Sequence, residues 1–105
     1  MATLTGHTKS GGQPSGALRC IELDVAMDDS YPTGGETITA LGALLDGYTI
    51  VACVADVVDV GGTSRKFKVN KTTKKVQAFT LDDAEVADLT DLALYTSVKP
   101  IIWVE

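Results

Sequence analysis

The sequence predicts an all-β protein: a small single-domain β-sandwich or barrel with about six antiparallel strands and an extended N-terminal arm. The first observation is length, because 105 residues suit one hydrophobic core and leave no room for a second. The second is composition: hydrophobic residues make up 45% of the chain and aromatic residues only 6%, so Ala, Val, Leu and Ile supply most of the core. The third is pattern, since short apolar stretches alternate with turn dipeptides and no helix of ten residues is indicated.

The N-terminal part of the chain differs in composition from the rest. Residues 1–16 are rich in Gly, Ser, Thr and Pro and contain one large apolar side chain after Met1, that of Leu4. Such a composition does not build a core. We expect either a plain flexible terminus or an arm that becomes ordered against a partner. Residues 17–105 then form the β-rich domain.

The first predicted strand of the domain lies within residues 17–27. Apolar and polar residues alternate there, and Ile21, Leu23, Val25 and Met27 share one face. A period of two with one polar face is typical of a half-buried strand.

The middle of the chain alternates turns with apolar segments. Residues 28–35 carry the Asp, Ser, Pro and Gly residues that turns require, and residues 36–40 indicate a short strand. Residues 41–45 form either one helical turn or the end of that strand. The longest apolar stretch, residues 48–60, predicts a central or interface strand in its first half and a bend near Ala55.

A hairpin is predicted from residues 65–70 and 75–80, which flank a polar turn. Its register puts apolar side chains on one face, with Val69 opposite Val76 and Phe67 opposite Ala78. The other face carries Lys66, Lys68 and Gln77, joined by Phe79.

The C-terminal part begins with an acidic stretch, residues 81–91, that we expect to be a linker with at most one short helical turn. Residues 92–104 return to a strand pattern interrupted by Pro100. Because proline donates no backbone hydrogen bond, this is predicted to be an edge strand or a strand with a bulge.

The sequence offers no arrangement of residues that is typical of an enzyme. The single histidine, His7, lies in the predicted arm, where nothing holds it against a nucleophile. Cys20 and Cys53 are far apart in the sequence, so we expect separate thiols rather than a disulfide or a metal site. The acidic pairs match no calcium loop, and the glycine pairs match no phosphate loop. We therefore expect no enzymatic activity, no cofactor and no metal.

The net charge and its distribution along the chain indicate which classes of partner the protein could bind. The net charge of −5 argues against general affinity for nucleic acid, and no apolar run approaches the roughly 18 residues that span a bilayer. Neither a secretory signal nor a membrane partner is expected. The predicted hairpin nevertheless holds six of the nine basic residues: Arg65, Lys66, Lys68, Lys71, Lys74 and Lys75. These residues form either a solvated face that blocks edge pairing or a contact for an acidic protein surface.

One motif resembles a known family. Residues 30–36 read SYPTGGE and are followed by Ile38-Thr39-Ala40-Leu41-Gly42. The pattern resembles that of small structural proteins of tailed bacteriophages, in which a strand precedes the motif. The resemblance continues through the hairpin and through Glu85-Val86-Ala87 and Thr90-Asp91-Leu92, and it covers residues 20–104. The final strand, where Lys99-Pro100 intrudes, and the Gly/Ser/Thr-rich N-terminal segment depart from the family pattern.

The resemblance implies a virion structural protein without enzymatic activity: a capsid decoration (cement) protein on the exterior of the phage head, assembled in the host cytoplasm. Its partners would be the major capsid protein and further copies of itself, with a trimer favoured. The alternative is a tail, neck or fibre adaptor. We expect the contacts to come from the arm, the SYPTGG loop, the basic hairpin and an exposed tryptophan. The candidate interface residues are Leu4, His7, Tyr31, Pro32, Arg65, Lys66, Lys68 and Trp103.

Overall fold

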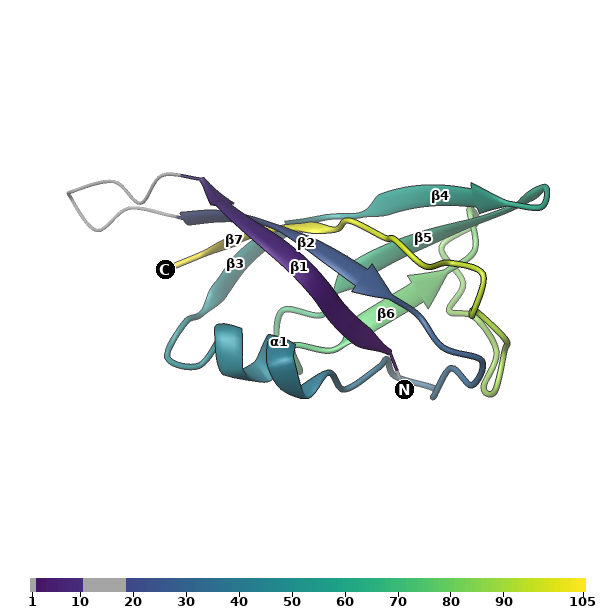
Figure 1. The fold of residues 1–105 in the computed structure, drawn as a ribbon, viewed down its shortest axis with the longest axis horizontal. Coiled ribbons are helices and arrows are strands. Elements are labelled where there is room, and N and C mark those ends of the chain that lie inside the picture. The colour runs from purple at the N-terminus through teal and green to yellow at the C-terminus, as the bar shows by residue number, and fades with distance from the viewer. Residues whose placement is uncertain (1, 11–18) are drawn as a thin grey trace.

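The computed structural model describes residues 2–10 and 19–105, which contain seven strands and one short helix. The strands form two antiparallel sheets, one in the order β1-β2-β7-β3 and the other in the order β4-β5-β6. Figure 1 shows the helix, α1, beneath β1 and β2 of the four-stranded sheet. The predicted all-β architecture is confirmed, with one strand more than the approximate number expected.

One hydrophobic cluster lies between the two sheets and the helix. The strand predicted within residues 17–27 is β2 (Arg19–Ala26), and its predicted apolar face is buried. Phe67 and Tyr95 contact each other in the core, with ring centroids 5.2 Å apart. The largest fully buried side chains are Tyr31, Phe67, Ile21, Leu23, Leu41, Leu45, Leu92 and Ile102.

The N-terminal segment differs from the arm that the sequence predicted. Thr3–Ser10 forms β1, which pairs antiparallel with β2, and Ala2 is buried. Leu4 is half-buried and packs against the core. An edge strand is held by backbone hydrogen bonds and tolerates small polar side chains, so the composition that argued against a core does not argue against this strand. The β-rich domain therefore includes β1. Residues 1 and 11–16 of the predicted arm lie outside the described residues.

Residues 36–40 do not form the predicted strand. Glu36 makes one isolated bridge to Val76, and the α-helix α1 (Thr39–Leu44) follows at once. For residues 41–45, the sequence left one helical turn or a strand end as alternatives, and the structure shows a helix. Its core-facing side consists of residues spaced by three and four positions, which a helix places on one face. The buried members are Ile38, Leu41 and Leu45.

The long apolar stretch serves both sheets, as the predicted bend requires. β3 (Ile50–Val54) is an edge of the four-stranded sheet, and β4 (Asp56–Val60) is an edge of the three-stranded sheet. Ala55 separates them. The prediction of a bend at this residue is confirmed.

The predicted hairpin is formed by β5 (Thr63–Val69) and β6 (Val76–Phe79), and its register matches the prediction at every pair that we named. The turn is stabilised by the Asn70 side chain, whose Oδ1 accepts hydrogen bonds from the backbone N–H groups of Thr72 and Thr73 at 2.9 Å. Local turn chemistry therefore fixes this register.

The last strand is central rather than at an edge. β7 (Ile101–Val104) lies between β2 and β3, and it starts directly after Pro100. The Pro100 carbonyl accepts a hydrogen bond from Leu23 N–H at 3.0 Å. Because proline has no backbone N–H, the pairing with β2 lacks one donor at this residue, and β7 begins after it. The acidic residues 81–91 contain turns and isolated bridges and no helix.

Candidate functional site

Catalytic residue types are dispersed in the fold. Within residues 2–10 and 19–105, no group of three or more His, Cys, Asp and Glu side chains lies close enough together to hold a metal ion. In that part of the chain no helix has the length and apolar character needed to cross a membrane. Cys20 and Cys53 are separate, half-buried thiols, as predicted. Burial raises the pKa of the Cys53 thiol, whose sulfur accepts a hydrogen bond from Val69 N–H at 3.3 Å.

Tyr31 lies inside the fold, which corrects the prediction that its side chain contacts a partner. Its hydroxyl donates to Glu85 Oε2 at 2.6 Å and accepts from Ala78 N–H at 3.1 Å. The same Glu85 oxygen accepts from Gly34 N–H at 2.8 Å. Burial, and then the bond to Glu85, raises the pKa of the Tyr31 hydroxyl. This hydroxyl therefore stays protonated and joins the motif loop to the acidic segment and to β6.

Backbone contacts tie the same two segments together. Tyr31 N–H donates to Thr90 O at 3.0 Å, and Leu89 N–H donates to Tyr31 O at 2.6 Å. Asp88 Oδ1 accepts from Thr33 N–H at 2.9 Å. The SYPTGGE motif and the acidic segment, which are distant in sequence, are thus bound to each other. Much of the motif therefore has a structural role in this protein.

The loops held in this way present apolar side chains to solvent. Pro32 is exposed, and Leu89 and Leu94 are 68% and 75% exposed. Leu94 belongs to the same set of loops, because Leu92 N–H donates to Asp28 O at 2.9 Å. We call Pro32, Leu89 and Leu94 the loop face. Of these three residues only Pro32 was predicted from the sequence, because a leucine in a loop gives no sign of its exposure.

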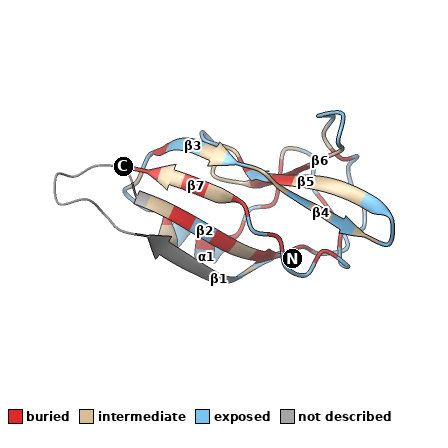
Figure 2. Cartoon of the chain, turned by 90° about the horizontal axis from the view of Figure 1, so that it is seen from above, coloured by how far each residue is buried: buried red, intermediate tan, exposed pale blue. Residues whose placement is uncertain are grey.

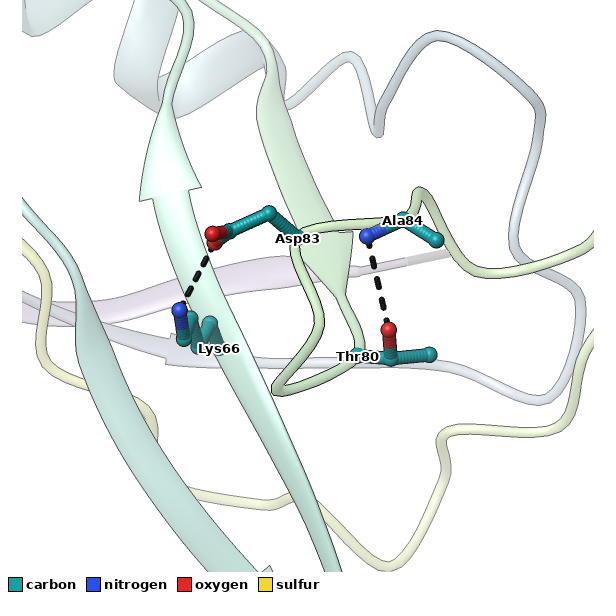
Figure 3. Close-up of polar contacts among 4 residues, drawn as sticks. All are labelled: Lys66, Thr80, Asp83 and Ala84. Atoms are coloured by element: carbon teal, nitrogen blue, oxygen red, sulfur yellow. Dashed lines mark hydrogen bonds and ion pairs between the residues drawn. The ribbon is translucent and has the colours of Figure 1, made fainter.

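The basic hairpin is partly neutralised within the molecule. Lys66 Nζ lies 2.7 Å from Asp83 Oδ1, as Figure 3 shows, and this ion pair lowers the pKa of Asp83. The turn that carries Asp83 is closed in the same figure by Ala84 N–H, which donates to Thr80 Oγ1 at 3.4 Å. Lys66 is therefore less available to a partner than the sequence indicated.

Other hairpin cations also have internal contacts. The Lys68 ammonium lies 4.5 Å from the centre of the Phe79 ring, which explains why Phe79 is on the polar face. Lys74 Nζ donates to Leu45 O at 3.2 Å. Arg65 is half-buried and lines a shallow, open depression of about 230 Å³ together with Asp91 and other residues. Lys68 is exposed and remains a candidate contact.

A second depression, of about 380 Å³, lies between β3 and the hairpin. Its lining mixes apolar, amide and cationic groups: Val51, Ala52, Cys53, Lys68, Val69, Asn70, Lys71 and Gln77. The arrangement combines no nucleophile with a base, so it is better suited to contact than to chemistry.

Trp103 is half-buried on the side of β7 that faces away from the core, which modifies the prediction of an exposed group. The register places it between Cys20 of β2 and Ala52 of β3. In the next row, Ile101 lies between Glu22 and Val54. We call these side chains the outer face: Cys20, Glu22, Ala52, Val54, Ile101 and Trp103. In Figure 2 the four strands lie side by side with α1 behind them, so this view looks onto the outer face.

Two predicted interface residues belong to the edge strand β1. Leu4 packs against the core, so only part of it is open to a partner. His7 pairs with Leu23 of β2. Both residues belong to an edge strand of the four-stranded sheet, and β1 pairs only with β2, so no strand pairing joins them to the hairpin or to the loop face.

Comparisons of this chain with protein-family models, with curated proteins and with solved structures find no match.

Proposed function

We propose that this protein is a virion structural component: a decoration (cement) protein that binds the exterior of a phage head and stabilises contacts between major capsid subunits. The resemblance of residues 20–104 to small phage structural proteins supports the proposal. The described surfaces agree with a docking role, because their exposed groups are apolar or charged side chains on a hydrogen-bonded β-scaffold.

The observation that carries the proposal is the loop face. Large apolar side chains that stay exposed on ordered loops are candidates for burial against another protein. Leu89 and Leu94 are the two most exposed of the large hydrophobic residues described. The Tyr31–Glu85 bond and the backbone bonds around it hold the loops in place, so docking requires little further ordering.

Binding would strengthen a shell by adding interface area across neighbouring coat subunits. Each subunit contributes a modest surface, and many copies on one particle multiply the effect. Exposed hairpin cations would add electrostatic complementarity to an acidic coat surface, although the chain itself is acidic.

Co-sedimentation with empty heads of the phage that encodes the chain tests the proposal. Leu94→Asp should weaken binding at least about tenfold, because it places a charge in a desolvated contact. Its free energy of unfolding should remain close to the wild-type value, since the side chain is exposed. Leu81→Asp is the matched control, at a leucine that is 54% exposed in a different turn, and it should bind as the wild type does.

The number of copies per virion distinguishes the proposed decoration protein from the alternative, an adaptor in the tail, neck or fibre. Decoration requires on the order of a hundred or more copies per virion, whereas a tail, neck or fibre adaptor forms a ring of about a dozen or fewer. Quantitative mass spectrometry of purified virions measures this number. Absence from virions, or equal head binding by Leu94→Asp and the wild type, would contradict the proposal.

A further inference from the structure

The outer face combines an aromatic centre with acidic groups. Trp103 is the single tryptophan of the chain, and small neighbours on both sides leave part of its ring open. Glu22 is exposed beside Ile101 in the next row. Glu105 is also exposed, and the alternation along β7 places it on the same side as Trp103. Neither glutamate makes a hydrogen bond or ion pair with a side chain that the structure describes.

The hairpin turn has the opposite charge and a different direction. Lys71 is exposed at the turn between β5 and β6 and forms no ion pair with the described residues. Lys74 Nζ reaches the carbonyl of Leu45, directly after α1, so the turn lies on the helix side of the molecule. Figures 1 and 2 place α1 behind the four-stranded sheet as seen from the outer face. Within one copy Lys71 lines the depression beside Ala52 at the β3 edge of the outer face, and among the described residues the turn makes no ring contact with Trp103.

Pairing of two outer faces with each other is disfavoured by their charge. Such a two-fold contact would bring the carboxylates of Glu22 and Glu105 near those of the second copy, and like charges in a desolvated contact oppose association. A lysine-rich turn avoids this repulsion. Its ammonium groups pair with carboxylates, its methylene stems cover apolar surface, and an ammonium ion binds best over a tryptophan ring.

We propose that the outer face around Trp103 binds the β5–β6 turn of a second copy of this chain, with Lys71 against the Trp103 ring and Glu22. Donor and acceptor surfaces differ, so the contact is head-to-tail and can repeat from one copy to the next. The inference rests on the proposed function, for which the resemblance implies further copies as partners, and it identifies the residues that would form the contact.

Analytical ultracentrifugation and Trp103 fluorescence of the full chain test this contact at low and high salt. The wild type should self-associate, its Trp103 emission should shift with protein concentration, and high salt should weaken the association. Glu22→Lys and Lys71→Glu should each raise the dissociation constant at least about tenfold. The double variant Glu22→Lys/Lys71→Glu should restore assembly, because position 22 is then basic and position 71 acidic, so opposite charges again face each other across the contact.

An exposed position outside both surfaces provides a matched control. Asp82→Lys, at an exposed position in a turn away from both surfaces, changes the net charge by the same amount as Glu22→Lys and should assemble as the wild type does. A wild type that stays monomeric up to about 1 mM, or single charge reversals that assemble normally, would overturn the inference. A monomer that binds phage heads would leave the proposed function intact, whereas an oligomer that ignores heads would refute only that function.

Discussion

At the residue scale, the two glycines of the motif have different surroundings. Gly34 and Gly35 have φ values of 95° and 114°, which side chains rarely adopt. A Cβ at Gly35 would lie 2.9 Å from Gln77 Cγ and 3.0 Å from the Val76 carbonyl oxygen, whereas one at Gly34 would meet nothing within 4 Å. A residue with a side chain would therefore have a strained backbone at either position, but its Cβ would clash with neighbouring atoms only at position 35.

We predict that Gly35→Ala lowers the free energy of unfolding by about 3 kcal/mol and that Gly34→Ala lowers it by about 1 kcal/mol. The larger loss reflects the displacement of β6 backbone as well as the unfavourable φ. Urea denaturation of the two variants measures the difference. Equal losses would show that close approach to β6 contributes nothing at Gly35.

Glu36 is the one buried carboxylate of the described core, at 5% exposure. Burial, and then the neighbouring Asp28 carboxyl group, raises the pKa of Glu36 to about 7. Its Oε1 is buried without a hydrogen-bond partner among the described residues. The folded protein therefore holds a proton at Glu36 over a pH range in which the unfolded chain releases it.

This shift has a definite sign. The difference in free energy of unfolding between the wild type and Glu36→Gln should be constant at pH values below about 4.5. As pH rises from there to about 7, the wild type should lose stability relative to the variant. The full loss amounts to at most about 3 kcal/mol, at about 1.4 kcal/mol per pKa unit. Urea unfolding of both proteins between these pH values measures it. A constant difference across the range would contradict a raised pKa at Glu36.

At the element scale, β1 decides how the N-terminal segment behaves. The strand pairs with β2 along its length, and Ala2 and Leu4 add contacts with the core. Residues that composition assigns to a free arm thus form part of the sheet. The β1 edge keeps mainly small and polar side chains, which is common where a sheet edge must remain soluble.

Removal of residues 1–10 should therefore destabilise the fold by several kcal/mol, roughly 2–4, because it uncovers the backbone of β2 and part of the core. Thermal unfolding followed by circular dichroism measures the loss. Removal of residue 1 alone is the control and should have little effect on β1. An unchanged melting temperature after removal of all ten residues would show that β1 contributes nothing to stability.

At the scale of the whole molecule, the two proposed docking surfaces lie on different parts of the fold. The loop face belongs to the loops around the Tyr31–Glu85 bond, and the outer face belongs to the four-stranded sheet. Attachment to a shell and contact between copies can therefore be separated by substitution. The variants at Leu94 address the first surface, and the charge reversals at Glu22 and Lys71 address the second.

The sequence by itself determined the local structure. Alternation marked β2, turn residues around Asn70 set the register of the hairpin, and the apolar stretch with its bend gave β3 and β4. These features depend on neighbouring residues in the chain, and their physical causes are side-chain alternation and turn geometry. The basic hairpin, the separate thiols and the outward position of Phe79 were predictable for the same reason.

Only the tertiary structure decided which distant segments meet. Pairing between strands placed β7 at the centre of its sheet and surrounded Trp103 with Ala52 and Cys20. Core packing selected a helix at α1, and the bond to Glu85 turned Tyr31 from a predicted contact into a buried support. Long-range hydrogen bonds and burial set these outcomes, and because both depend on the whole fold, no local pattern in the chain encodes them.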